Sequence, residues 1–154
     1  MAKTVLKLTN ENSYDFLLFG IICQKKDYRL CRELNLKLGI EMVRKDDYSV
    51  FNNKRMEDHS FSFFEYVNDD EDQFNLISNK CPKGMLLPEH SQFDFLFIIR
   101  TEKLRIDESS MIADMKQIPF VLGVFKLDAS KLKSRENLVF WFDKRMAPLP
   151  ITTE

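Results

Sequence analysis

The stretch FLLFGII at residues 16–22, followed by DYRLCRELNLKLG at residues 27–39, decides the fold class. The first stretch is a continuous apolar run of strand length, which predicts a strand buried on both faces of a sheet. In the second stretch, Asp27 can cap the start of a helix, and Gly39 stands where glycine commonly ends one. One face of this helix would carry the apolar residues Leu30, Cys31, Leu34 and Leu38.

Further strands are predicted on both sides of this strand and helix. Apolar or weakly alternating runs of strand length stand at residues 5–8, 40–43, 61–67, 74–77, 93–99 and 120–127. The polar, mostly acidic residues 68–72 separate two of these runs and predict the loop of a hairpin. The segment 46–58 is polar, and we expect it to be irregular.

A second helix is predicted after Asp107, which can act as its N-cap. Its inward face would carry Met111, Ile112, Met115 and Ile118. Pro119 would end this helix, because proline cannot continue the hydrogen-bond ladder. Residues 128–130 predict a short helical turn. The last apolar run, residues 138–142, is expected to be a contact surface, either within the sheet or between two chains.

The order of strands, helix, several strands, helix and strand predicts an α+β fold. Because short turns join most of the strands, we expect a mainly antiparallel sheet with two principal helices packed on it. A helix between two strands can also place them side by side in parallel, so a mixed sheet remains an alternative. Residues 1–147 are expected to form a single domain, and residues 148–154 a loose C-terminal tail.

The composition is that of a globular protein. Of 154 residues, 44% are hydrophobic and 31% charged, and the formal net charge of −1 gives no global case for binding nucleic acid or acidic membranes. The longest apolar run, residues 16–23, is shorter than the roughly 20 residues that span a bilayer. Three irregularly spaced cysteines do not form a disulfide framework, so we expect reduced thiols and a cytoplasmic protein.

The motifs of common cofactor sites are missing. The cysteines and histidines lack the paired spacing of metal ligands, and the acidic residues 69–72 lack the alternating ligands and the glycine of a calcium loop. The four glycines are not clustered, so neither the P-loop nor the glycine-rich motif of dinucleotide-binding domains occurs. We therefore expect no cofactor and no metal site.

Two carboxylates flank the start of the most apolar predicted strand, at Glu89 and Asp94. Along that strand Asp94 shares a face with Leu96 and Ile98, so its charge needs a partner or a raised pKa. Glu89 and Asp94 could form the acid/base pair of a small enzyme. Alternatively, Asp94 forms an ion pair with Arg29 or Lys133 and organises the fold.

The segment from residue 131 to residue 145 mixes basic and aromatic side chains. Candidate contacts to a partner or to nucleic acid are Lys131, Lys133, Arg135, Trp141, Lys144 and Arg145. Basic residues interleaved with aromatics are typical of surfaces that bind single-stranded nucleic acid, and Trp and Arg are typical of protein interfaces. The aromatics of this segment could also simply complete the core.

The motif Leu87-Pro88-Glu89-x3-Phe93-Asp94-Phe95 resembles the I-P-E-x3-V-D-Y signature of a family of uncharacterised bacterial proteins. Further similar pieces follow in the family's order from about residue 20 to residue 140, among them Asp27-Tyr28-Arg29-Leu30, Asn79-Lys80 and Leu132-Lys133-Ser134 with Asn137. This chain departs from the signature at Leu87, Phe93 and Phe95. The resemblance implies a small cytosolic protein and no particular activity.

The positions shared with that family are polar residues near the ends of predicted elements. We expect Asp27, Arg29, Glu89, Asp94, Lys133 and Asn137 to form one polar network or to line one site.

A small non-enzymatic binding or regulatory module, which acts through protein–protein contacts, is the favoured function. The alternatives are a single-stranded RNA-binding protein and a small enzyme. A homodimer is a further hypothesis, since the run 138–142 offers apolar surface to a second chain.

Overall fold

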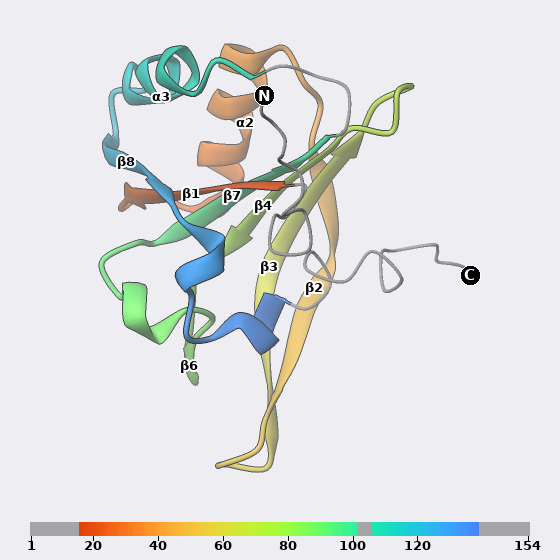
Figure 1. Ribbon diagram of the computed structural model, residues 1–154, viewed down its shortest axis with the longest axis vertical. Helices are drawn as coiled ribbons and strands as arrows, with labels where there is room; N and C mark the ends of the chain where they lie inside the picture. Colours follow the sequence, from red (N-terminus) through yellow and green to blue (C-terminus); the bar gives the residue numbers. More distant parts are fainter. Residues whose placement is uncertain (1–15, 102–105, 139–154) are drawn as a thin grey trace, which may run out of the picture.

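A six-stranded sheet forms the centre of the computed structural model, which describes residues 16–101 and 106–138 (Figure 1). The strands in spatial order are β2 (Val43–Asn52), β3 (Glu57–Val67), β4 (Gln73–Ser78), β7 (Phe95–Arg100), β1 (Phe16–Cys23) and β8 (Val121–Leu127). Every strand pairing among the described residues is antiparallel. The predicted α+β class with a mainly antiparallel sheet is confirmed.

Two helices, α2 (Asp27–Leu38) and α3 (Glu108–Lys116), cover one face of the sheet in the described part (Figure 1). Helix α2 connects β1 to the far edge strand β2, and α3 connects β7 to β8. The opposite face is covered by two loop segments, which contain the small hairpin β5 (Lys80–Cys81) and β6 (Gly84–Met85) and the short helical turns η2 (Pro88–His90), η3 (Ala129–Lys131) and η4 (Arg135–Leu138).

The sheet separates two apolar cores. In β7, Phe95, Phe97 and Ile99 pack under the helices, whereas Leu96 and Ile98 face the loop segments. Strand β1 is divided in the same way, so the prediction that residues 16–22 are buried on both faces is confirmed. A strand covered on both faces carries a continuous apolar sequence, as these two strands do.

The predicted ends of the helices are confirmed with one correction. Asp27 lies in the first turn of α2, and the N-cap is Lys26, which makes no side-chain cap hydrogen bond. Gly39 adopts a left-handed conformation with φ of 69°, where its N–H donates to the carbonyl of Asn35 at 2.9 Å. Asp107 caps α3 as predicted, since its side chain accepts from the N–H of Ser110.

The expectation that residues 46–58 are irregular is wrong. Most of them belong to β2 and β3, which form a long hairpin that extends away from the rest of the sheet (Figure 1). The strand predicted at residues 40–43 begins only at Val43. Apolar side chains are sparse here because β2 is an edge strand, and only Tyr48 and Val50 pack against the second core.

Three expectations lie outside the described residues: the strand at residues 5–8, the part of the apolar run after Leu138, and the tail at residues 148–154. Among the described residues, no helix is both long and apolar enough to cross a membrane.

Candidate functional site

Glu89 fastens one loop segment to the other on the face opposite the helices. Its Oε2 accepts hydrogen bonds from the backbone N–H groups of Lys133 at 2.8 Å and Ser134 at 2.9 Å. Its Oε1 accepts from the Ser134 hydroxyl at 2.6 Å. The same segment is held a second time by Asn137, whose Nδ2 donates to the carbonyl of Leu86 at 2.7 Å. These contacts anchor residues 133–137 over the second core.

The environment of Glu89 favours its ionised form. Partial burial opposes ionisation, but the hydrogen bonds from the Ser134 hydroxyl, from the backbone of Ser134 and Lys133, and from its own N–H together lower the pKa of Glu89 below its usual value of 4.5. A general acid at neutral pH needs the opposite shift. Glu89 therefore has the environment of a structural carboxylate.

Replacing Glu89 by glutamine should make the stability of the protein less dependent on pH. Because the folded-state pKa is lowered, the stabilisation by Glu89 is complete above about 4.5 and is lost as the pH falls through the folded-state pKa. At neutral pH we expect Glu89→Gln to cost about 1 kcal/mol, since a neutral amide replaces a charged acceptor. Urea unfolding across this pH range measures the difference.

The control for this experiment is Glu136→Gln, which removes a carboxylate from an exposed position in the same segment. The stability difference between the parent and Glu89→Gln should shrink on acidification, while Glu136→Gln follows the parent. A difference that stays constant down to low pH would show that the carboxylate charge does not hold this segment.

Asp94 joins the start of β7 to the end of β1. Its Oδ2 accepts from the N–H of Cys23 at 2.9 Å, and its Oδ1 accepts from Nζ of Lys80 at 3.0 Å. The predicted ion pair with Arg29 or Lys133 is therefore wrong, because the neighbouring hairpin supplies the cation. The Asp94 side chain is 24% exposed and that of Lys80 42%, so this pair is worth far less than a fully buried one.

Glu89 and Asp94 are thus each engaged by backbone N–H groups of other segments. Neither residue lines the hollow between α2 and β2, which is the pocket considered as a binding site. This geometry supports a structural role for both carboxylates and gives no support to the acid/base pair.

The remaining polar positions that were expected to form one network do not all meet. Asp27 lies by Arg44 at 3.4 Å, and Arg29 places its guanidinium carbon 5.4 Å from the centre of the Phe120 ring. Both residues are on the helix-covered face, whereas Glu89, Asn137 and the backbone of Lys133 meet on the other. The expected single network is therefore divided between the two faces.

The described part of the basic segment is largely engaged in its own structure. Lys131 is highly exposed and lies 4.0 Å from Asp128, while Nη2 of Arg135 donates to the carbonyl of Ser130 at 2.6 Å. Lys133 is exposed, and its N–H is bound by Glu89. Trp141, Lys144 and Arg145 lie outside the described residues.

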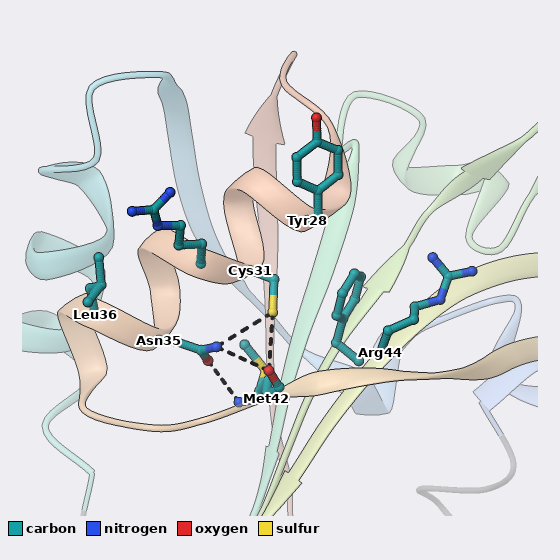
Figure 2. A pocket seen from close by; sticks show the side chains of 8 residues that line it. Tyr28, Cys31, Asn35, Leu36, Met42 and Arg44 are labelled. Carbon is teal, nitrogen blue, oxygen red and sulfur yellow. Dashed lines mark hydrogen bonds between the residues drawn. The ribbon is translucent and has the colours of Figure 1, made fainter.

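A hollow of about 320 Å³ lies between α2 and the start of the edge strand β2. It is lined by Tyr28, Cys31, Arg32, Asn35, Leu36, Met42, Arg44 and Phe64. Figure 2 shows Tyr28, Asn35 and Leu36 along α2, with Arg44 on β2 across from the helix.

Asn35 builds the floor of the hollow. Its Oδ1 accepts from the N–H of Met42 at 2.9 Å and its Nδ2 donates to the carbonyl of Met42 at 3.1 Å (Figure 2). The Asn35 amide therefore binds both backbone groups of Met42, as a neighbouring strand would. This pairing fixes the distance between α2 and β2. The neighbouring Cys31 is buried, which raises the pKa of its thiol to about 11 and keeps it protonated at neutral pH.

The rim of the hollow combines exposed apolar side chains with guanidinium groups. Tyr28 is 59% and Leu36 69% exposed, and with Arg32 between them they form an i, i+4, i+8 stripe along α2. The guanidinium carbon of Arg44 lies 5.6 Å from the centre of the Phe64 ring, and this side chain also contacts Asp27 and Asp47. Arg32 makes no ion pair with any described residue.

No group of three His, Cys, Asp or Glu side chains within residues 16–101 and 106–138 is arranged to hold a metal ion. Compared with models of protein families the chain matches none, and no curated protein matches it. The resemblance to the I-P-E-x3-V-D-Y signature stays a prediction.

The hollow was not predicted from the sequence. One signal was available, because Tyr28 and Leu36 occupy the polar side of a clearly amphipathic helix at a spacing of eight residues. Arg44 and Phe64, which close the hollow from β2 and β3, had no such signal, since the pairing of these strands was not predicted in full.

Proposed function

We propose that this protein is a non-enzymatic binding module that takes up a segment of a protein partner in the hollow between α2 and β2. The observation that carries this proposal is the stripe of Tyr28, Arg32 and Leu36, which exposes two large apolar side chains beside a cation that forms no ion pair with any described residue. Exposed apolar and aromatic residues next to arginine are typical of the energetic centres of protein interfaces.

The charge around the hollow favours an acidic partner. The two charged side chains that line the hollow, Arg32 and Arg44, are both cations. The chain as a whole carries a net charge of −1, so this positive region is local. A carboxylate of the partner would pair with Arg32, and an adjacent apolar side chain would pack between Tyr28 and Leu36.

The chemistry of the hollow supports binding rather than catalysis. Its one thiol is held protonated by burial, and its one amide is committed to the backbone of Met42. Arg44 is already engaged with two aspartates and an aromatic ring. These groups shape the surface and give it charge.

Selection of short random peptides displayed on phage against the immobilised full-length chain tests this proposal. We expect the enriched peptides to combine acidic and apolar residues. For a peptide selected in this way, Arg32→Glu should weaken binding at least about tenfold, because charge repulsion replaces an ion pair. Leu36→Asp should weaken it as well. Fluorescence anisotropy of the labelled peptide gives the dissociation constants.

The matched control is Lys54→Glu, which makes the same change of net charge at an exposed position in the β2–β3 turn. Its affinity for the peptide should equal that of the parent. Peptides that bind Arg32→Glu and the parent equally well would contradict the proposal. So would an experiment in which no peptide is enriched but a single-stranded RNA oligonucleotide binds, with an affinity that falls steeply with salt.

A further inference from the structure

The start of the edge strand β2 forms one wall of the hollow between α2 and β2. An edge strand presents a row of backbone N–H and carbonyl groups that no neighbouring strand binds. At Met42, directly before β2 begins, the side chain of Asn35 binds both of these groups, at 2.9 Å and 3.1 Å (Figure 2). The hollow therefore already contains the first hydrogen bonds of an added strand, supplied there by a side chain.

The backbone of Arg44 faces the same outer edge as that of Met42. Successive residues of an antiparallel strand direct their backbone groups to opposite sides, so residues two apart share a side. The β3–β4 ladder gives the same result independently. Its bond from the N–H of Asn68 to the carbonyl of Asp72 recurs at every second residue, which directs Phe64, the partner of Arg44, toward β4. Among the described residues outside the sheet, none binds the backbone of Arg44.

The free part of this edge is one residue long. Before Arg44, the edge is taken by Asn35. After it, the carbonyl of Lys45 accepts from Nε of Arg44 at 3.1 Å, and the pairing with β3 shifts between Lys45 and Tyr48. The shifted stretch contains two aspartates, residues 46 and 47. Irregular pairing and charge of this kind keep an edge from pairing further, so an added chain would pair with Arg44 alone.

We propose that the partner segment in the hollow is extended and runs antiparallel to β2, with one of its residues exchanging both backbone hydrogen bonds with Arg44. This inference rests on the proposed function and adds the conformation and the anchor point of the bound segment. An antiparallel pair satisfies both groups of Arg44 with a single residue, whereas a parallel pair would need the residues on either side of it. In strand addition, such main-chain bonds supply affinity, and pockets for alternate side chains supply specificity.

The side chain of the paired residue would enter the hollow. Residues directly opposite in an antiparallel pair share a face of the sheet, and Arg44 shares the helix-covered face with Phe64, its partner in β3. Both of these residues line the hollow. A carboxylate on the paired residue would lie between Arg44 on β2 and Arg32 on α2, so an acidic residue fits this position. The side chains before and after it would point away from α2.

Single N-methylation along a peptide tests the strand pairing. The probe is a peptide selected on the full-length chain whose binding Arg32→Glu weakens. Methylation of one acidic residue, the one opposite Arg44, should weaken binding at least about tenfold, because it removes the N–H that donates to the Arg44 carbonyl. Methylation of the residues directly before and after it serves as the control and should change the dissociation constant less than about twofold, since their N–H groups point away from β2.

Amide hydrogen exchange measures the other bond of the pair on the protein itself, without any substitution in the fold. In the complex with the unmethylated peptide, the amide of Arg44 should exchange at least about tenfold more slowly than in the free chain, because its N–H becomes bonded to the peptide. The amide of Lys54, which is exposed in the β2–β3 turn, is the control and should exchange at the same rate in both states.

Two results would overturn the strand pairing and leave the hollow as the binding site. The first is a methylation scan in which no single position stands out, as a helical segment would give. The second is an Arg44 amide whose exchange does not slow, although Arg32→Glu weakens the same complex. Selected peptides whose binding Arg32→Glu leaves unchanged would contradict the proposed function itself, and the strand pairing with it. The two failures are therefore distinguishable.

Discussion

Replacing Asn79 by alanine is expected to lower the free energy of unfolding by about 3–5 kcal/mol. Asn79 is fully buried. Its Nδ2 donates to the carbonyls of His90 at 3.0 Å and Phe93 at 2.9 Å, and its Oδ1 accepts from the N–H of Leu87 at 2.8 Å. Alanine would remove the side-chain partner of the Leu87 N–H and the Phe93 carbonyl, while the His90 carbonyl would keep only its bond from the N–H of Phe93.

Urea unfolding followed by circular dichroism measures this loss. The control is Asn53→Ala, since Asn53 is exposed in the β2–β3 turn, and we expect it to lie within about 0.5 kcal/mol of the parent. If Asn79→Ala were as stable as the control, the loop from residue 79 to residue 94 would not depend on this amide.

Replacing Gly20 by alanine is expected to destabilise the fold by about 2–3 kcal/mol, although alanine suits a strand better than glycine does. The added Cβ would lie 2.5 Å from Cδ2 and 2.6 Å from Cγ of Phe93. Because the contacts include Cγ, the ring atom nearest the Phe93 backbone, a rotation of the ring alone does not relieve them and the whole side chain must move. Phe93 is buried and packs against His90 and Phe125, which leaves it little room.

A double-mutant cycle separates this steric effect from any other consequence of the substitution. Phe93→Ala alone should cost about 3–5 kcal/mol, because it leaves a cavity above Gly20. In that background the methyl group of Gly20→Ala occupies part of the cavity, so the double variant should be more stable than the sum of the two single effects by at least about 1 kcal/mol. Strictly additive effects would show that the two residues are not coupled.

Most of the elements could be predicted because the sheet has two cores. A strand buried on both faces, such as β1 or β7, is apolar throughout, and a helix on the surface of a core shows the 3.6-residue period. The β2–β3 hairpin was missed for the corresponding physical reason. Within β2 only Tyr48 and Val50 pack against a core, so the pattern that predicts strands is absent there although the backbone hydrogen bonds form, whereas Phe61 and Phe63 of β3 are buried.

The sequence could show which polar residues are important, but it could not show which groups they contact. The sequence shows that Asp94 lies among apolar neighbours and needs a partner, and it does not show that one partner is the N–H of Cys23, 71 residues away. Backbone groups carry no sequence signal. For the same reason the sequence did not predict the structural role of Asn79, which lies between β4 and β5 and whose side chain binds backbone groups of the loop that follows.

The location of the binding surface is tested most directly by nuclear magnetic resonance. Backbone amide shifts of the full-length, isotope-labelled chain would be recorded with and without a peptide selected on it. We predict that the shift changes concentrate on α2 and the start of β2, around Tyr28, Arg32, Leu36 and Arg44, and that Arg32→Glu abolishes them at the same peptide concentration. Changes that map instead to β8 or to the segment from residue 131 to residue 138 would contradict the account.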